Sequence, residues 1–501
     1  MSDHPGDPPR SESPTRAQQR VTIDTLALHS VGGDVRDDGP NAVMYAWFQL
    51  FKTAQIHAID NQALSRPVQA FADLSARVVA RDGHISLQAK DGTIFLNSNK
   101  LRLTTDEYVL AGEIIGFFKE RGMGGFTIDG PLDTETVRTL LKIFIYAPTA
   151  ERSFESVANA LRASGAPFRI NKPLGVGLKS RSEVVLERRG YTFLTYSKLA
   201  VLYRSLLADE KSSASRRQYL IRKIARTMQA LVDICIEDDH TFLDAAAIKS
   251  GESYASQHAA NVAVLSIALG DKVGFNKIEL ADLGMAALFA DLGLRECGTF
   301  IQEKPAPLDF TERASVELHP IRTVQLLLTQ KTFTKTVLSQ IVVAFEHHRH
   351  LDGTGYPKAQ GRPDLFSRIV MIADVYDSLT TLRPWRRAYL PDEALGMMVS
   401  KAGPWFDTAL LKIFVRMVGL YPVGTLVRLD SGEIGVVIYG GGEGERISRP
   451  VVILLSKDGK PQATVDLTER APEGHYVRSI VASEDPTAFG VNPSGLLTNI
   501  A

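Results

Sequence analysis

Six histidine and aspartate side chains lie at the ends or on the inner faces of successive apolar segments between residues 250 and 380. In chain order they are His258, Asp291, His319, His347, His348 and Asp374. Histidines are scarce in this chain, with 11 in 501 residues, yet five of them fall between 258 and 350. Imidazole and carboxylate ligands suit first-row transition metals such as iron or manganese. Paired metals about 3.5 to 4 Å apart clamp the attacking and leaving oxygens in phosphoester hydrolysis, so the set predicts a centre for one or two ions.

Helices must bring these side chains together, because the residues are far apart in the sequence. The apolar segments that carry or flank them are SYASQHAANVAVLS, MAALFADLGL, VLSQIVVAFE and RIVMIADVYDSLT. His319 precedes Pro320, which places it at the start of a helix. Adjacent helical residues diverge by about 100°, so the rings of His347 and His348 can occupy neighbouring ligand positions. An aspartate such as Asp291 beside apolar residues is costly unless it is paired or bound to a metal.

Five segments occur in a characteristic order between residues 246 and 420. They are SYASQHAANVAVLS, AALFADLGL, ELHP, HHRHLDGTGYP and RIVMIADVYDSLTTLRPWR. In order and approximate spacing they resemble the HD-GYP domain, a helical branch of the HD phosphohydrolases that cleaves cyclic di-GMP. The resemblance implies an all-α domain, a divalent transition metal as cofactor, and cyclic di-GMP or a related nucleotide as ligand.

The resemblance also implies a role for each residue of the motifs. Asp291 matches the aspartate that bridges two metals, and Asp377 joins it as an expected catalytic residue. The first metal would be completed by His258 and Asp374, and the second by His319, His347 and His348. Asp377, Arg383 and Arg386 match positions near the nucleotide phosphates. The signature loop beside the substrate consists of Gly353, Gly355, Tyr356 and Pro357.

Three residues depart from the pattern of the family. Ala290 replaces the histidine of the HD pair and removes one ligand of the first metal. Leu294 replaces a lysine that would offset phosphate charge. Arg349 replaces a glutamate after the paired histidines, and its positive charge would either disfavour a metal nearby or attract a phosphate.

These losses favour a signalling domain with a degenerate site and with reduced or no hydrolysis. Such a domain would act as a receptor or scaffold that binds nucleotide or signalling proteins. The alternative is an active metal-dependent phosphodiesterase that opens cyclic di-GMP to pGpG or GMP. Hydrolysis of another phosphoester, and a core in which the histidines merely pack, also remain open.

Composition limits the partners and the compartment. Lys plus Arg equals Asp plus Glu, at 57 each, so no global field attracts nucleic acid or an anionic membrane. The only cysteines, Cys235 and Cys297, form no CxxC motif, which fits a reduced cytoplasm. No uninterrupted apolar run reaches the roughly 18 to 20 residues that a membrane span needs. We therefore expect a cytoplasmic protein without a membrane span.

The pattern along the chain predicts a multidomain α+β protein. The expected parts are a disordered tail (1–21), an α/β N-terminal domain (22–178), a helical connector (179–245), the HD-GYP-like domain (246–420), and a small antiparallel β module with a C-terminal tail (421–501). Residues 22–178 are expected to have a regulatory or dimerising role. If they dimerise, the protein would be a homodimer.

Local patterns give more detailed expectations outside the histidine-rich region. HISLQAKDGTIFLNS alternates around Asp91-Gly92 and predicts a β-hairpin. Asp133 is expected to cap the helix of TETVRTLLKIFIYA. In the connector, apolar residues from Leu220 to Leu231 recur on one helical face. The run from Val423 to Leu455 alternates in period two, and its glycines 440–442 indicate a hairpin loop rather than a phosphate loop.

Overall fold

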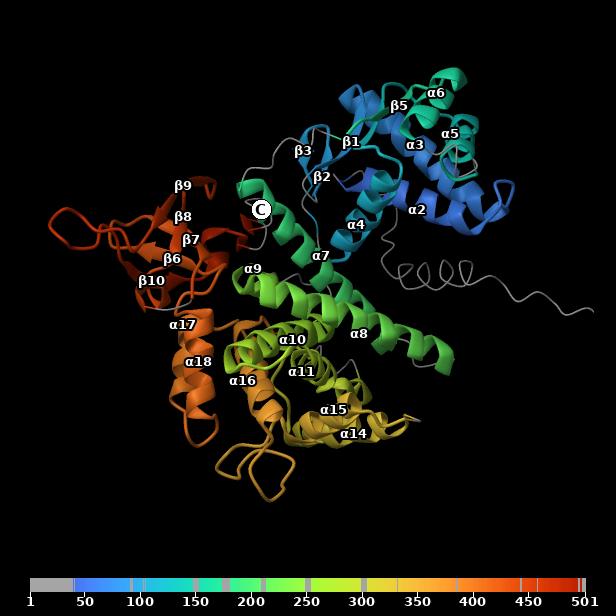
Figure 1. Cartoon of the computed structure of the whole chain (residues 1–501). Helices are drawn as coiled ribbons and strands as arrows, with labels where there is room; N and C mark the ends of the chain where they lie inside the picture. The colour runs from blue at the N-terminus through green and yellow to red at the C-terminus, as the bar shows by residue number, and fades with distance from the viewer. Residues whose placement is uncertain are drawn as a thin grey trace, which may run out of the picture. The chain divides into compact units, whose positions relative to one another are not determined.

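The computed structural model divides the chain into two compact units, Met1–Leu178 and Lys179–Ala501 (Figure 1). The described residues are 39, 41–90, 93–101, 103, 105–146, 153–173, 181–208, 213–247, 254–298, 304–330, 332–383, 386–441, 444–456, 458–493 and 496–497. The tail expected over residues 1–21 lies outside them. Each unit is described by itself.

The first unit combines one antiparallel sheet with helices, which confirms the predicted mixed class. Its strands follow the order β3-β2-β1-β4-β5, with bounds β1 Ile85–Lys90, β2 Thr93–Leu96, β3 Asn99–Lys100, β4 Gly125–Ile128 and β5 Phe168–Asn171. Its helices are α2 Ala42–Ile56, α3 Ser65–Asp82, α4 Thr105–Glu120, α5 Thr134–Leu141 and α6 Phe154–Ser164. The predicted hairpin is confirmed, since β1 pairs antiparallel with β2, while its turn residues 91 and 92 are not described.

Local capping and an aromatic core hold this unit together. The Asp133 carboxylate accepts a hydrogen bond from the Thr136 backbone N–H at 2.7 Å, so the predicted cap of α5 is confirmed. Trp47 is 1% exposed, and its ring centroid lies 4.1 Å from that of Phe126 and 5.8 Å from that of Phe168. These rings join α2 to β4 and β5, so the helix is fixed on the sheet by apolar burial.

Long helices open the second unit. They are α7 Arg181–Ala208, α8 Ala214–Glu237 and α9 Asp239–Asp244. The predicted apolar face of α8 is confirmed, because Leu220, Ile224, Met228 and Leu231 are all at most 1% exposed. Its opposite side carries arginines in solvent, as expected for a packing helix.

A bundle of helices follows and carries all the candidate metal ligands. Its members are α10 Tyr254–Val273, α11 Lys277–Phe289, α13 Phe310–Glu317, α14 His319–Leu328, α15 Lys335–Glu346, α16 Leu365–Thr380, α17 Pro391–Val399 and α18 Thr408–Val418. Helix α10 is the central one, with every residue from Ala259 to Gly270 buried. A Cβ at Gly284 of α11 would lie 2.7 Å from the side chain of Ile267, so the glycine permits close packing of α11 on α10.

The chain ends in a five-stranded antiparallel sheet, the β module, as predicted. Its order is β10-β6-β7-β8-β9, with bounds β6 Leu426–Leu429, β7 Ile434–Tyr439, β8 Val451–Leu455, β9 Pro461–Asp466 and β10 Ile480–Glu484. Gly440 and Gly441 lie in the connection from β7 to β8. That connection pairs two antiparallel strands, which supports the interpretation of these glycines as a hairpin loop.

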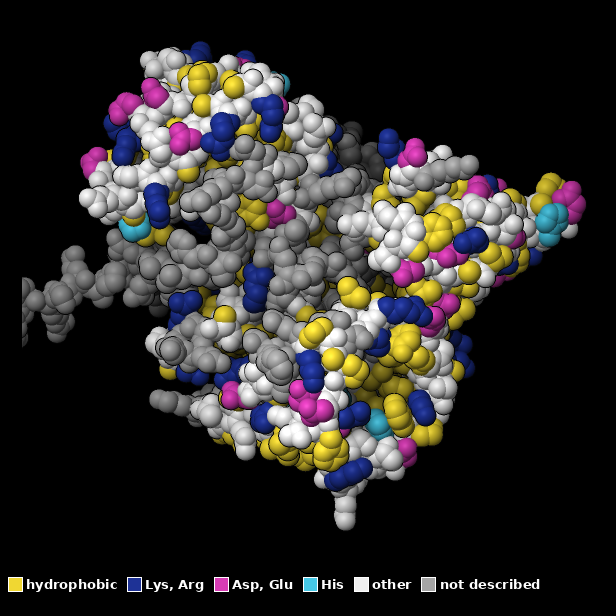
Figure 2. Space-filling view, turned by 180° about the vertical axis from the view of Figure 1, so that it is seen from behind, with side chains coloured by type: hydrophobic (Ala, Val, Ile, Leu, Met, Phe, Trp, Pro, Cys, Tyr) yellow, Lys and Arg dark blue, Asp and Glu magenta, His cyan; other side chains and the backbone are white. Residues whose placement is uncertain are grey.

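Two surface properties bear on function. Among the described helices, none has the length and apolar character needed to cross a membrane. On the face in Figure 2, the described Lys and Arg side chains are scattered among Asp and Glu side chains. That mixture agrees with the equal numbers of acidic and basic residues in the sequence.

Candidate metal centre

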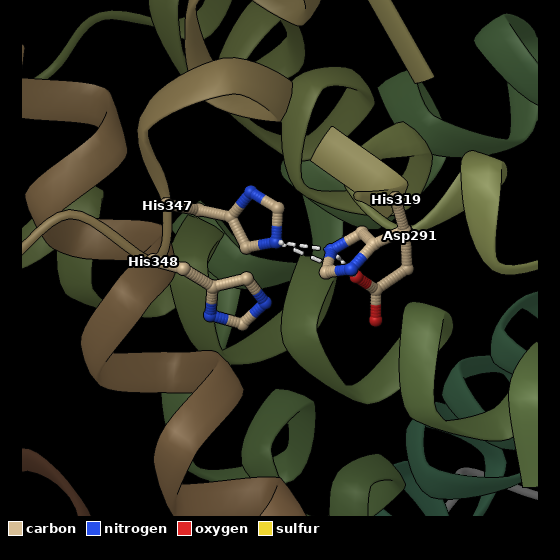
Figure 3. Close-up of side chains that lie close together, drawn as sticks. All are labelled: Asp291, His319, His347 and His348. Atoms are coloured by element: carbon tan, nitrogen blue, oxygen red, sulfur yellow. Dashed lines mark hydrogen bonds and ion pairs between the residues drawn. The ribbon is translucent and has the colours of Figure 1, made fainter. Parts of the chain in front are cut away.

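One cluster of ligand atoms joins three helix ends. Asp291 follows α11, His319 begins α14, and His347 and His348 follow α15. Each of the four offers a ligand atom within 4.8 Å of the others. Figure 3 shows the rings and the carboxylate converging from these elements. The Oδ1 atom of Asp291 lies 3.1 Å from Nε2 of His319 and 3.4 Å from Nε2 of His347.

A second cluster shares Asp291. His258 on α10 and Asp374 on α16 complete it, and their ligand atoms also lie within 4.8 Å of one another. The His258 Nε2 atom lies 2.9 Å from Asp374 Oδ1 and 3.4 Å from Asp291 Oδ2. The two oxygens of Asp291 therefore face different clusters, which is the arrangement of a carboxylate that can bridge two ions.

Backbone carbonyls orient the histidines of the first cluster. Nδ1 of His319 lies 2.8 Å from the carbonyl oxygen of Val316, and Nδ1 of His347 lies 3.0 Å from that of Val343. A carbonyl only accepts, so each Nδ1 carries the proton in a neutral ring, and each Nε2 carries a lone pair. The two Nε2 atoms lie 3.3 Å apart. Two lone pairs at this distance repel unless a cation lies between or beside them.

The Asp291 carboxylate, which lies beside the two histidine Nε2 atoms, also favours a bound cation. Oδ1 of Asp291 is buried, and its polar neighbours are Nε2 of His319 and Nε2 of His347, neither of which donates a hydrogen bond to it when its ring is neutral with the proton on Nδ1. A buried carboxylate oxygen without a hydrogen bond is costly, and a metal ion satisfies it. With imidazole and carboxylate as the only donors, the residues fit a divalent transition metal. The combined donor set can hold one or two ions.

The pKa directions show that protons and a metal compete for this site. Although burial opposes the shift, Tyr254 and the carboxylates of Asp291, Asp374 and Asp377 raise the pKa of His258 well above its usual value, and Asp291 raises the pKa of His347 against the effect of burial. An ion would have to displace these protons.

Burial raises the pKa of the Asp291 carboxyl, but His258, His319 and His347 lower it by more. Its pKa therefore lies well below the usual value. Burial and the charges of His347 and His319 hold the pKa of His348 well below the ordinary value. Asp291 is therefore charged and His348 neutral near pH 7, and these are the forms that bind a metal.

His258 is held from behind by a buried relay that links it to α7. Its Nδ1 donates to Asp377 Oδ2 at 2.7 Å, and Asp377 Oδ1 accepts from Asn261 Nδ2 at 2.8 Å. The hydroxyl of Tyr196 donates to Asn261 Oδ1 at 2.6 Å. The relay leaves the Nε2 atom of His258 directed at Asp291 and Asp374.

This relay changes the position expected for Asp377. The sequence predicted a position near the phosphates, but Asp377 is 2% exposed and its carboxylate is bonded to His258 and Asn261. The reason is that Asp377 lies three residues, almost one helical turn, after Asp374 on α16, directed at α10. Sequence reasoning missed Asn261 and Tyr196, although Asn261 stands three residues after His258 on α10 and shares its face.

The signature loop packs directly on the paired histidines. The backbone N–H of Tyr356 donates to the carbonyl of His348 at 3.1 Å, and the Tyr356 ring centroid lies 4.7 Å from that of His348. Gly355 has a φ of +85°, and a Cβ there would collide with the carbonyl oxygen of His348. Gly353 lies at the exposed part of the loop, and Pro357 follows Tyr356 in half-buried surroundings.

Arg349 does neither of the two things expected from its charge. Its guanidinium lies 2.8 Å from the Glu346 carboxylate and donates to the carbonyls of Ala359, Gln360 and Gly361 at 2.8 to 3.0 Å. The side chain is buried, and these partners lie in α15 and in the segment after the signature loop. The arginine therefore fastens the loop segment to α15. The i, i+3 spacing of Glu346 and Arg349 was the signal that sequence reasoning overlooked.

The two expected phosphate arginines differ in their surroundings. The guanidinium of Arg383 lies 3.8 Å from the ring centroid of Tyr254, whose ring stacks on His258 at 5.3 Å. Arg383 is thus close to the second cluster. Arg386 donates to the carbonyls of Ser378 and Leu379 at 2.9 and 3.1 Å, so it caps the end of α16.

The profile of the HD domain family matches residues 202–410, a stretch that begins within α7 and includes α8. The chain is 28% identical over 355 residues to the cyclic di-GMP phosphodiesterase PA4108 of Pseudomonas aeruginosa, covering 69% of this chain and 82% of that protein. Residues 202–410 therefore form an HD domain.

Other relatives match shorter stretches. The 3'3'-cGAMP-specific phosphodiesterase 3 of Vibrio cholerae is 31% identical over 171 residues, 34% of this chain and 36% of that protein. The response regulator RpfG of Xanthomonas campestris, a cyclic di-GMP phosphodiesterase, is 25% identical over 261 residues, 51% of this chain and 63% of that protein. The solved structure of Bd1817, an HDG"Y"P protein from Bdellovibrio bacteriovorus, covers 66% of this chain and 93% of its own, at 14% identity and a TM-score of 0.40.

With its paired histidines and GYP loop, the chain is an HD-GYP domain protein, as the sequence predicted. The family is one of metal-dependent phosphohydrolases, and the His/Asp clusters described above are able to bind metal.

Proposed function

We propose that this protein is a cyclic di-GMP signalling protein that binds the dinucleotide, or a related one, at the Asp291 centre and hydrolyses it slowly or not at all. The observation that carries the proposal is the sharing of Asp291 by two donor clusters whose histidine Nε2 atoms face inward. The names of the relatives supply the ligand class, since several act on cyclic dinucleotides.

The proposed cofactor is iron or manganese. His319, His347, His348 and Asp291 would hold one ion, and His258, Asp291 and Asp374 a second. When bound, such ions supply Lewis-acid activation of a phosphodiester. The protein's own contribution is to hold Nδ1 of His258, His319 and His347 against fixed acceptors, so that each Nε2 is the atom that would bind an ion once any proton on it is displaced.

Arg383 is the group that we assign to the ligand phosphates. Its guanidinium stacks on Tyr254 beside the second cluster, and a planar guanidinium is suited to bidentate phosphate binding. Tyr356, held against His348 by the loop, would contact the ligand from the opposite side. Arg386 would act indirectly, by fixing the segment after α16 through its bonds to Ser378 and Leu379.

Two substitutions support slow turnover. The methyl group of Ala290 is 4% exposed beside Asp291 and offers no donor atom, so the second cluster has three ligands. Leu294 brings no charge, and the neighbouring Arg295 is paired with Glu296 at 3.2 Å. Loss of a ligand and of a phosphate-binding cation lowers stabilisation of the charge that develops in phosphoryl transfer.

A second candidate function is full phosphodiesterase activity yielding pGpG or GMP. The observation in its favour is that each oxygen of Asp291 faces a group of donors, and the group beside Ala290 still has three ligands. Three protein ligands suffice for many catalytic metal centres.

One experiment separates these functions. Full-length protein purified without oxygen is analysed for metal, titrated with cyclic di-GMP by calorimetry, and incubated with it while products are separated by chromatography. The proposal expects metal, binding and little product, together with a rise of at least about tenfold in product for Ala290→His, which restores a ligand. His347→Ala should abolish metal binding. Rapid turnover by the unaltered protein would establish the second function, and absence of dinucleotide binding to metal-loaded protein would refute both.

For residues 22–178 we propose a regulatory or dimerising role, in a protein of the cytoplasm. The support is their separate compact core in the first unit. Light scattering of the full-length protein over a range of concentrations would detect a dimer, and a monomer throughout would leave regulation as the role.

A further inference from the structure

A cavity of about 590 Å³ lies inside the second unit, between the β module and the helices that carry the metal centre. Its walls come from α7, α9, α16, the end of α18 and the β module, and Figure 1 shows the β module beside α17 and α18. None of the six candidate metal ligands is among the described residues that line it. The cavity is therefore separate from the centre around Asp291.

The lining has the composition of a small-molecule site. Most of it is apolar, with Leu243, Leu390 and Met417 as examples, and the rings of Tyr389 and Tyr439 contribute aromatic surface. The volume falls in the range of about 300 to 1,000 Å³ that is usual for ligand pockets, which combine apolar walls with a few polar groups.

The charges in the wall define what the cavity can accept. Its only cationic lining residue among those described is Arg189, which is already paired with Asp244 at 2.8 Å and donates to the carbonyl of Ile438 at 3.3 Å. The remaining charged lining residues are the acids Asp238, Asp377, Glu484 and Asp485. Two of them are also paired, Glu484 with Arg428 at 2.7 Å and Asp377 with His258 at 2.7 Å. Asp238 and Asp485, for which the described residues show no ion pair, disfavour an anionic ligand such as a cyclic dinucleotide, whereas an uncharged or cationic ligand meets no such repulsion.

We propose that this cavity is a second ligand site, for an uncharged or cationic, largely apolar small molecule, and that its occupancy is transmitted to His258 through Asp377. Tyr376, Asp377 and Thr380 of α16 line the cavity, and the carboxylate of Asp377 holds Nδ1 of His258 at 2.7 Å. An occupant that shifts this part of α16 changes the orientation of a metal-binding ring. The binding half of the proposal stands by itself, and the transmission half rests on the proposed metal centre.

Two fluorescent probes that share a naphthylamine core test the ligand class. N-phenyl-1-naphthylamine is uncharged, and 8-anilinonaphthalene-1-sulfonate carries a negative charge on nearly the same rings. Full-length protein should bind the uncharged probe at least about tenfold more tightly. Ala388→Trp, which places an indole in the cavity, should weaken that binding at least about tenfold. Ala409→Trp is the matched control, because Ala409 is exposed on α18 and is not a lining residue.

The outcomes distinguish the two halves. Uncharged-probe affinity that is the same in Ala388→Trp as in the unaltered protein, or tighter binding of the sulfonate, would overturn the site. Transmission is tested by titrating Mn²⁺ with and without saturating uncharged probe. The expected change in Mn²⁺ affinity is at least about fivefold in the unaltered protein and absent in Ala388→Trp. Probe binding that leaves the Mn²⁺ affinity unchanged overturns transmission. Failure to bind Mn²⁺ under any condition overturns the metal centre and the transmission half, while the probe site stands.

Discussion

The relay from Tyr196 through Asn261 and Asp377 to His258 makes a graded prediction about metal affinity. Asn261→Ala removes the donor to Asp377 Oδ1 and the acceptor for the Tyr196 hydroxyl, both of them buried. The Asp377 carboxylate then loses one of the hydrogen bonds that orient it, and it holds the His258 ring less firmly. Loss of the direct outer partner of a metal-binding histidine, here Asp377, typically weakens metal binding by about 10- to 100-fold, or about 1.4 to 2.8 kcal/mol. Asn261 is bonded to that partner rather than to His258, so Asn261→Ala should weaken binding by about tenfold, the lower end of this range. Tyr196→Phe removes only the outermost bond, so it should weaken binding by less than about tenfold.

The assay is calorimetric titration of Mn²⁺ into metal-free protein, with thermal unfolding measured in parallel. Unfolding should also be affected, because each buried polar group that loses its partner costs about 1 to 3 kcal/mol. Ser266→Ala is the matched control. Ser266 lies on the same helix, is fully buried, and its hydroxyl has no hydrogen-bond partner among the described residues. It should therefore leave Mn²⁺ affinity unchanged.

The order of the effects carries the test. Asn261→Ala should weaken Mn²⁺ binding most, Tyr196→Phe should weaken it less, and Ser266→Ala should leave it unchanged. A folded Asn261→Ala protein whose Mn²⁺ affinity stays within about twofold would show that the relay does not position His258. Equal weakening in Ser266→Ala would show that general loosening of α10 explains the effect.

Three further predictions concern other parts of the second unit. Gly355→Ala should lower the melting temperature and weaken dinucleotide binding measured by calorimetry, because its Cβ collides with a backbone carbonyl beside the metal centre; an unchanged affinity would contradict the packing of the loop. Arg349→Met should free the segment after the loop, seen as faster amide hydrogen exchange at residues 359–361, whereas exchange as in the unaltered protein would mean that the arginine is dispensable. The paired guanidinium of Arg446 lowers the pKa of Asp466 to about 2. A depressed carboxyl pKa stabilises the fold above the unfolded pKa of about 4, and this contribution disappears as the pH falls through about 2. Acid titration followed by circular dichroism should show that Asp466→Asn lacks this component; an unchanged acid transition would assign it to other carboxyls.

Local patterns were sufficient for many elements of the fold. The hairpin of β1 and β2, the cap of α5 by Asp133 and the apolar face of α8 all depend on residues within a few positions of one another. Such features follow from turn chemistry, capping and helical periodicity, so a sequence predicts them well. The order of strands in each sheet, with β4 beside β1 and β10 beside β6, depends on distant packing and was not predictable in this way.

The candidate site also has features that the sequence predicted and features that only the structure showed. The types and order of the six candidate metal ligands could be predicted from the sequence, because histidines and aspartates beside apolar helices have few uses other than ligation or pairing. Their sharing of Asp291 was implied by family resemblance, and the structure places its two oxygens toward different clusters. The bonding partners of Arg349 and Asp377 could not be predicted from the sequence. A charge in a sequence does not specify its partner, and both residues bond to groups inside the fold.

The sequence by itself determined which residues are available for chemistry and which helices carry them, because residue type and helical period are local properties. The tertiary structure alone decided where each polar side chain finds its partner. A buried charge must be satisfied by whatever group the packing brings within about 3 Å. For Arg349 that group is a carboxylate with three carbonyls, for Asp377 it is a histidine and an amide, and for Arg386 it is the end of α16. The separate cavity behind α16 likewise exists only because the β module packs against the helices of the HD domain.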